Sequence, residues 1–223
     1  MKVKIVTPIL EGNDRIAREL KAFYDKNGIF VFNVISSPGA GKTTLLEALL
    51  EYMRRAFKIA VIVGDIEDTV DAARLSKPNV QTIQLNTKGA CHLDASMINA
   101  ALKELDTTQL DVVIVENVGN LVCPSDFDLG EDLRIVVLSA TEGDDKPKKY
   151  PLTFFKSSIA VINKVDLIPY TNFNLEKAKQ DILSINPSIK IFEVTATKQE
   201  TVFGLVQFLE DKIRRKKHIS LNG

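Results

Sequence analysis

The sequence predicts an α/β fold in which a mostly parallel, twisted sheet is flanked by helices. Apolar, strand-like stretches alternate with helical ones over short connections, as in sheets whose crossovers are helices. One continuous apolar run leads directly into a glycine-rich segment and then a helix. At 223 residues the chain is long enough for one well-buried core, so we expect a single domain over residues 1–223.

The pattern of apolar residues predicts where the helices and strands lie along the chain. Residues 13–26 predict an amphipathic helix, and we expect residues 1–28 to form a helical extension packed on the domain. The apolar run at 29–35 suits a central strand covered on both faces. Further strands are expected at 58–63, 80–84, 111–115, 134–138, 158–162 and 190–194, and further helices at 45–55, 93–105, 174–185 and 201–215.

Composition excludes several classes of protein. The 29 basic residues balance the 29 acidic ones, so the chain has no overall field to attract nucleic acid. No apolar run approaches the roughly 20 residues that span a bilayer, and the first residues lack the features of a secretory signal. Two cysteines do not build a disulfide framework. We therefore expect a cytoplasmic protein that binds neither nucleic acid nor membrane.

The segment SSPGAGKTT at residues 36–44 has the strand and helix context of a P-loop. Its glycines let successive backbone N–H groups point at phosphate oxygens, beside the positive end of a helix. We expect Lys42 to reach the β- and γ-phosphates, Thr43 to bind magnesium and Thr44 to contact the α-phosphate. The usual pattern opens with glycine, whereas this loop opens with Ser36. The predicted phosphate site comprises Pro38, Gly39, Ala40, Gly41, Lys42, Thr43 and Thr44.

An N-K-x-D motif at residues 163–166 follows another predicted strand. A carboxylate such as Asp166 accepts hydrogen bonds from N1 and the exocyclic N2 of guanine, a pair of donors that adenine lacks. We expect Asn163 to tie this loop to the phosphate loop and Lys164 to lay its stem over the purine. A looser match after the last strand adds Ala196 and Thr197 as expected nucleotide contacts.

Two further strand ends carry carboxylates. Glu116 leads to Gly119 in an E-x-x-G pattern, in which Glu116 holds magnesium through a water and the Gly119 N–H senses the γ-phosphate. Asp65 ends another strand, whereas Asp68 and Asp71 fit a solvated helix start. The expected catalytic residues are Lys42, Thr43, Asp65 and Glu116, of which Thr43, Asp65 and Glu116 hold Mg²⁺. We expect slow hydrolysis, because no glutamine resembles a water-positioning residue and no arginine an internal finger.

Cys91, His92 and Cys123 form a second constellation. Cys91 and His92 are adjacent, and Cys123 follows the Glu116 strand closely, so we expect all three at the same edge of the sheet. Two thiolates and an imidazole suit zinc or nickel. Three ligands leave a tetrahedral site incomplete, so the metal either shares ligands across a two-fold axis or keeps an open position.

These motifs together resemble the HypB family of hydrogenase nickel-incorporation GTPases. ENVGNLVCP and the Cys-His pair carry most of the resemblance, and ISSPGAGKTTLLE, GDIEDTVDAARL, TEGDDKPKKYP and INKVDLIPY extend it over nearly the whole chain. The resemblance implies a GTPase of the SIMIBI class, which includes the signal-recognition GTPases and the related UreG. It also implies a homodimer that forms with GTP and holds metal, a HypA-type partner, and delivery of nickel to the large subunit of [NiFe]-hydrogenase. The N-terminus lacks the Cys-rich or His-rich stretches of some members, so we expect a nucleotide-gated metal site of lower affinity.

Three rival functions stay open at this point. The chain could be a metallochaperone GTPase for another enzyme such as urease, a P-loop kinase of small molecules, or a metal-binding protein with a vestigial nucleotide site. The N-K-x-D motif disfavours the kinase, and the intact Lys42-Thr43 pair disfavours the vestigial site. A basic loop with Lys146, Lys148 and Lys149 is compatible with a partner contact or with a solvated loop.

Overall fold

A computed structural model describes residues 9–65 and 70–222 of the chain. Seven parallel strands form one sheet in the order β3-β2-β4-β1-β5-β6-β7, which confirms the predicted fold class. Every predicted strand is present. Their bounds are β1 (Phe30–Ser36), β2 (Ile59–Asp65), β3 (Val80–Asn86), β4 (Val112–Glu116), β5 (Leu133–Ser139), β6 (Ile159–Asn163) and β7 (Lys190–Glu193).

The middle of the sheet is buried on both faces. All residues of β1 are buried, because the strand pairs with β4 on one side and β5 on the other and is covered by helices above and below. Parallel strands in such a position are mostly apolar, and in β1 only Asn33 and the final Ser36 are polar, which explains why the sequence predicts a strand at 29–35. β3 and β7 lie at the edges of the sheet and are only partly buried.

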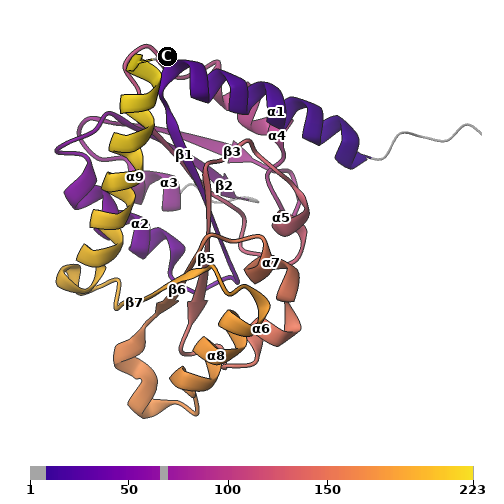
Figure 1. Cartoon of the computed structure of the whole chain (residues 1–223), viewed down its shortest axis with the longest axis vertical. Helices are drawn as coiled ribbons and strands as arrows, with labels where there is room; N and C mark the ends of the chain where they lie inside the picture. Colours follow the sequence, from indigo (N-terminus) through magenta and orange to yellow (C-terminus); the bar gives the residue numbers. More distant parts are fainter. Residues whose placement is uncertain (1–8, 66–69, 223) are drawn as a thin grey trace, which may run out of the picture.

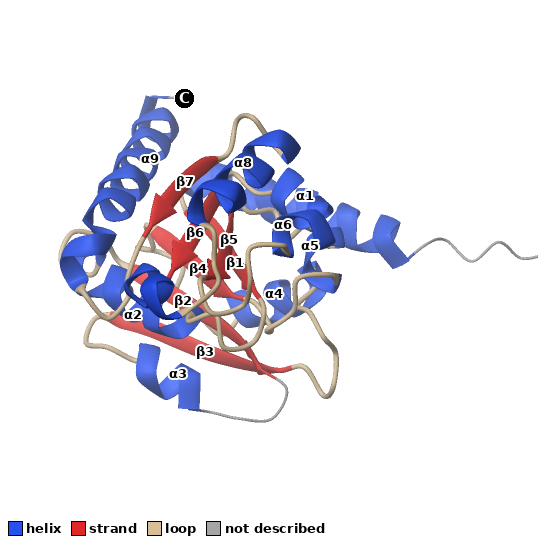
Figure 2. Cartoon of the chain, turned by 90° about the horizontal axis from the view of Figure 1, so that it is seen from below, coloured by secondary structure: helices blue, strands red, loops and turns tan. Residues whose placement is uncertain are grey.

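Helices form a layer on each face of the sheet (Figures 1 and 2). On one face, α2, α3 and α9 pack over a continuous apolar core that includes residues of β1, β2, β4, β5 and β6. On the other face, α1 and α4 cover one half of the sheet and α5 to α8 lie over the other half. The helices are α1 (Ile9–Asn27), α2 (Lys42–Met53), α3 (Val70–Leu75), α4 (Ala95–Leu102), α5 (Cys123–Asp126), α6 (Lys146–Lys149), α7 (Pro151–Phe155), α8 (Leu175–Ile185) and α9 (Phe203–Asn222).

Helix ends differ from the sequence prediction in informative ways. The helix expected at 93–105 begins at Ala95, because Asp94 accepts a hydrogen bond of 2.9 Å from Met97 N and caps it. Leu93 therefore lies outside the helix. The first helix starts at Ile9, four residues before the predicted start. None of the helices in the described ranges is long and apolar enough to cross a membrane.

Candidate nucleotide and metal site

The parallel strands bring the predicted site residues to one edge of the sheet. Lys42 follows β1, while Asp65, Glu116 and Asn163 are the last residues of β2, β4 and β6. Carboxyl ends of parallel strands share an edge, and this edge is where open α/β sheets bind ligands. The contacts between the loops show how closely these residues meet.

The phosphate loop needs glycine at position 41 for two reasons. Gly39 and Gly41 have φ values of 77° and 94°, in the left-handed region that costs other residues free energy. A Cβ on Gly41 would also lie 2.5 Å from the Asn163 side-chain nitrogen, whereas a Cβ on Gly39 would meet nothing within 4 Å. Gly41 is therefore required both by the turn and by the close approach of Asn163.

Lys42 lies buried inside the phosphate loop. Its ammonium donates a hydrogen bond of 3.1 Å to the hydroxyl of Ser36, the residue that replaces the usual first glycine. Burial lowers the pKa of Lys42, while the charges of Glu116, Asp71, Glu142 and Asp65 oppose that shift. The loop thus holds its lysine in place with its own first residue.

Thr43 and Glu116 form the contact between the phosphate loop and β4. Thr43 Oγ1 donates a hydrogen bond of 2.7 Å to Glu116 Oε1. Burial raises the pKa of Glu116 to about 7, against the opposing effects of this hydrogen bond and of Lys42. Glu116 Oε2 is buried and has no hydrogen-bond partner among the described residues. A hydroxyl beside an unpartnered buried carboxylate oxygen is the kind of donor set that Mg²⁺ binds.

Asp65 and Asp71 are the other acidic residues singled out from the sequence that the structure describes. Asp65 is half-buried at the end of β2, and its charge acts on Lys42, so it lies close enough to belong to the same site. Asp71 pairs with Arg74 at 3.4 Å on α3, and its charge also acts on Lys42 and Glu116, so it lies near the same site. Asp68 lies outside the described residues.

The base loop is tied to the phosphate loop through Asn163, as the sequence predicts. Asn163 Nδ2 donates to Ala40 O at 2.9 Å, and its Oδ1 accepts from Lys164 N at 2.8 Å and Ala196 N at 3.1 Å. Lys164 has a positive φ of 60°, and its ammonium donates to Gly39 O at 2.8 Å. One buried amide thus joins the phosphate loop to both segments expected to contact the base.

Thr195 orients Asp166. Its hydroxyl donates a hydrogen bond of 3.1 Å to Asp166 Oδ1 and lies 3.3 Å from Asp166 N. Thr195 is buried and precedes Ala196 in the segment that the sequence predicts to lie near the base. Thr197, two residues further, is exposed.

Gly119 lies against the phosphate loop. A Cβ at this position would be 3.1–3.2 Å from the Cα, Cγ and N atoms of Pro38, closer than nearly all real contacts of this kind. The loop after β4 therefore rests directly on the loop after β1. Four residues later, the same loop reaches Cys123 at the start of α5.

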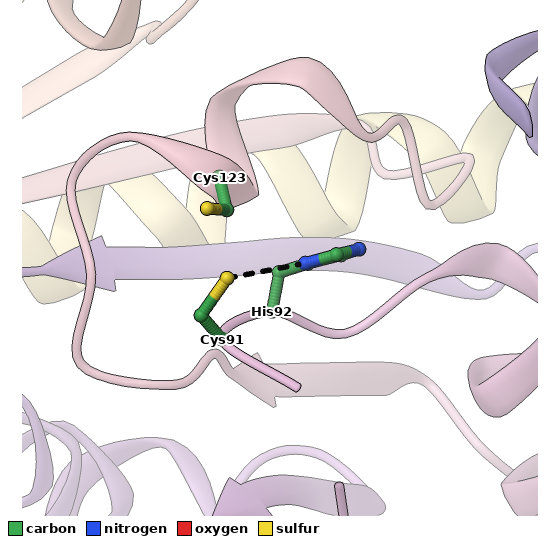
Figure 3. Close-up of side chains that lie close together, drawn as sticks. All are labelled: Cys91, His92 and Cys123. Carbon is green, nitrogen blue, oxygen red and sulfur yellow. Dashed lines mark hydrogen bonds between the residues drawn. The ribbon is translucent and has the colours of Figure 1, made fainter. Parts of the chain in front are cut away.

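Cys91, His92 and Cys123 meet, as predicted. One candidate ligand atom from each lies within 4.8 Å of the others, and the three side chains come from two separate segments (Figure 3). Cys91 Sγ is 3.8 Å from His92 Nδ1. Contact with the Cys123 thiol, together with burial, raises the pKa of Cys91. Burial lowers the pKa of His92, which favours the neutral imidazole that ligates metals.

A buried arginine that the sequence did not reveal holds one half of this cluster. Arg134 at the start of β5 donates to Ser125 O at 3.0 Å and to Phe127 O at 2.9 Å. It is itself fixed by two hydrogen bonds of 2.6–2.8 Å to Glu131. Phe127 stacks on the His92 ring with centroids 3.8 Å apart. Arg134 therefore supports both the helix that begins with Cys123 and the aromatic ring against His92.

A buried asparagine from the first helix joins the two halves. Asn13 Oδ1 accepts from Ala95 N at 2.8 Å, and its Nδ2 donates to Asp128 O at 2.8 Å. Ala95 follows the Cys91-His92 pair, and Asp128 follows α5. The two partners of Asn13 lie 82 and 115 residues away from it in the sequence. No local sequence pattern could therefore have predicted that Asn13 joins these segments.

The sheet order and the phosphate loop define a P-loop nucleotide-binding protein. Residues 30–193 match the model of the CobW/HypB/UreG nucleotide-binding domain, so the chain belongs to that family. It is 41% identical to the hydrogenase/urease maturation factor HypB of Helicobacter hepaticus, covering 94% of this chain and 88% of that protein. It is 42% identical to the hydrogenase maturation factor HypB of Escherichia coli, covering 93% of this chain and 72% of that protein.

The fold agrees with a solved structure as well. The crystal structure of HypB from Helicobacter pylori in complex with nickel superposes with a TM-score of 0.87 and 40% identity, over 92% of this chain and 97% of that chain. At this identity and coverage, the resemblance predicted from the motifs is confirmed as membership of the HypB branch of the family.

Proposed function

We propose that this chain is a GTP-binding, slowly hydrolysing metallochaperone that dimerises with GTP and assists nickel insertion into [NiFe]-hydrogenase. One observation carries the proposal. The loop that leaves Glu116 passes over the phosphate loop at Gly119 and then supplies Cys123 to the Cys-His-Cys cluster. A nucleotide site and a thiolate metal site thus share one short segment, an arrangement that a simple GTPase does not need.

The nucleotide site has a role for each predicted residue. Lys42 and the backbone N–H groups of the loop hold the phosphates, and Asp166, oriented by Thr195, reads the guanine edge. Thr43, Asp65 and Glu116 would hold the magnesium ion, whose chemistry is to neutralise phosphate charge. Asn163 keeps the base loop and the phosphate loop at a fixed distance, so base recognition and phosphate binding occur together.

We propose slow turnover because no arginine near the phosphate loop is free to act on the phosphates among the residues that the structure describes as contacting that loop. Arg74 Nη2 reaches the Thr44 hydroxyl at 3.0 Å but is also bonded to Glu47 Oε2 at 2.5 Å. Arg74 is thus engaged in an ion pair within the chain, and we assign it no role in stabilising charge on the phosphates. We propose that dimerisation or a partner accelerates hydrolysis.

The metal is cargo in this proposal. Two thiolates and a neutral imidazole suit Ni²⁺ or Zn²⁺, and the nickel complex of the Helicobacter pylori relative supports nickel. The partners proposed from the family are a HypA-type nickel-binding protein and the large subunit of [NiFe]-hydrogenase. Urease is the second candidate target, because the Helicobacter hepaticus relative is named for both enzymes.

The proposal is tested by titrating Ni²⁺ and Zn²⁺ into the full chain and its variants, with Mg–GDP present. Cys91→Ser, His92→Ala and Cys123→Ser should each lower affinity for the metal by at least about tenfold, since each removes a ligand. His218→Ala on α9 is the matched control and should leave the affinity unchanged. Equal metal affinity in all variants would place the metal elsewhere and overturn the proposal. A separate assay of GTP hydrolysis by the wild-type chain that detects no phosphate release would overturn it as well.

A further inference from the structure

Leu93 lies between the ends of the two strands that carry the nucleotide-site carboxylates. Its backbone N–H donates a hydrogen bond of 3.0 Å to Asn117 Oδ1, and Asn117 directly follows Glu116. Its side chain fills the space beside Gly64, which directly precedes Asp65. A Cβ on Gly64 would lie 2.7–2.9 Å from Leu93 Cγ, Cδ1 and Cδ2. Leu93 is fully buried, and the residue before it is His92.

Asn117 is fixed to the sheet on every side. Its backbone N donates to Val34 O at 3.0 Å, and its Nδ2 donates to Asn33 Oδ1 at 3.2 Å. Its Oδ1 accepts from Val118 N as well as from Leu93 N, both at 3.0 Å. Such a buried amide cannot shift without leaving donors unsatisfied, which is unfavourable away from water. The Leu93 N–H is therefore constrained to move with Asn117.

We propose that Gly64, Leu93 and Asn117 form a junction that transmits changes at the nucleotide site to His92. The inference rests on the proposed function and names the residues through which nucleotide state would regulate the metal site. A displacement of Glu116 on binding of nucleotide and Mg²⁺ moves Asn117, its chain neighbour, and the hydrogen bond carries Leu93 along. A displacement of Asp65 moves Gly64, and Leu93 must respond because no free space separates them.

The junction complements the direct connection through Gly119. That loop couples the nucleotide to Cys123, whereas the junction couples it to the Cys91-His92 pair. Both halves of the metal cluster are thereby linked to the nucleotide site by short, packed paths. Two discrete arrangements of these contacts would give two metal geometries.

Asn13 provides a matched control within the same scaffold. It holds Ala95 and Asp128, so it supports the same two metal-ligand segments, but it does so from α1, which packs on the opposite face of the sheet from α2. Loss of Asn13 should weaken metal binding equally in both nucleotide states. Loss of Asn117 should change the dependence of metal binding on the nucleotide.

The test measures the affinity of the full chain for Ni²⁺ with Mg–GDP and with a non-hydrolysable Mg–GTP analogue, both at saturation. The coupling ratio is the quotient of the two dissociation constants, and for the wild type we expect it to depart from one by at least about fivefold. Asn117→Ala should bring the ratio within about twofold of one, whereas Asn13→Ala should keep the wild-type ratio. By reciprocity, Ni²⁺ should shift the nucleotide affinities by the same factors.

A second variant covers the case in which Asn117→Ala does not fold. Gly64→Ala keeps every hydrogen bond of the junction but forces Leu93 to move, and it should change the ratio by at least about threefold. Gly12→Ala on α1 adds the same methyl group where nothing lies within 4 Å and should change nothing. A wild-type ratio in the folded Asn117 and Gly64 variants overturns the junction while leaving the gating model intact. A ratio of one in the wild type overturns both, and an equal loss of coupling in Asn13→Ala shows that the junction is merely structural.

Discussion

Thr43 Oγ1 donates a hydrogen bond of 2.7 Å to one oxygen of Glu116, and the other oxygen of that carboxylate is buried without a partner among the described residues. The Thr43 hydroxyl and the Glu116 carboxylate therefore offer oxygen ligands to a bound cation such as Mg²⁺. Burial raises the pKa of Glu116 to about 7, so without the cation the protonated and ionised forms of this carboxyl are both populated at neutral pH.

Glu116→Gln should stabilise the metal-free protein at high pH. The pKa of Glu116 is higher in the folded than in the unfolded chain, so this group costs no stability below about pH 4.5, and the cost grows as pH rises to about 7. At pH 8, in EDTA, the variant should exceed the wild type by about 1–3 kcal/mol in free energy of unfolding, with the gain disappearing near pH 4.5. Urea unfolding at both pH values measures this difference.

The same variant should lose its response to magnesium. Wild-type affinity for Mg²⁺ with GDP should rise as pH increases through about 7, because the carboxyl must ionise to bind the ion. In Glu116→Gln the affinity should be weak and independent of pH. Equal stability at pH 8, or an unchanged magnesium affinity, would contradict the assigned role.

Gly41→Ala and Gly39→Ala should differ although both add one methyl group at a positive φ. Each pays a backbone strain of about 1–3 kcal/mol. Only at position 41 does the new carbon meet Asn163, at 2.5 Å, which displaces the amide that joins the phosphate and base loops. We expect Gly41→Ala to weaken GDP binding at least about tenfold more than Gly39→Ala, as measured by fluorescent-nucleotide titration. Similar losses in the two variants would show that Asn163 does not join the loops in solution.

Asp166→Asn should change the base preference of nucleotide binding from guanine to xanthine. The carboxylate accepts from two donors of guanine, whereas the C2 carbonyl of xanthine needs a donor that an asparagine amide supplies. Affinity for GDP should fall by about 100-fold or more, and affinity for xanthosine diphosphate should rise. Competition titrations with both nucleotides decide the matter. Loss of both affinities would instead indicate that Asp166 supports the loop rather than reading the base.

Arg134→Met should damage the metal site and the fold together. The substitution leaves Glu131 buried without its partner and removes two hydrogen bonds to the segment after Cys123, at a cost of about 3–5 kcal/mol in stability. Adding Glu131→Met should restore part of the stability, because the unpaired charge is gone. Affinity for Ni²⁺ should stay about 10–100-fold low in both variants, since the support of Phe127 and Cys123 is still missing. Full recovery of nickel binding in the double variant would exclude this positioning role.

Much of the fold and the site could be predicted from the sequence, because burial and phosphate binding impose local patterns of residue types. Strands covered on both faces, such as β1 and β4, are apolar at nearly every position. The phosphate and base motifs need particular residues at particular spacings, and the two cysteines fall after strands whose ends share an edge. These constraints act within a few residues of sequence, so a single sequence displays them.

The supporting residues could not be predicted for the opposite reason. Asn13, Asn117 and Arg134 act through hydrogen bonds to segments far along the chain or to backbone atoms, and a lone polar residue in a helix, a loop or a strand start looks like a surface residue. The short helices α5 to α7 span one turn or little more, which is too short to show a helical period. Their existence depends on tertiary contacts.

The coupling between nucleotide and metal is tested most directly by one comparison on the wild-type chain. The affinity for Ni²⁺ and the mass in solution are measured with saturating Mg–GDP and with a saturating non-hydrolysable Mg–GTP analogue, with Cys91→Ala beside it as the variant lacking a ligand. We predict a dimer with the GTP analogue and nickel affinities that differ at least about fivefold between the two nucleotides, with high-affinity binding lost in Cys91→Ala. Identical nickel affinity in the two states, with both nucleotides bound, would contradict a nucleotide-gated metal site.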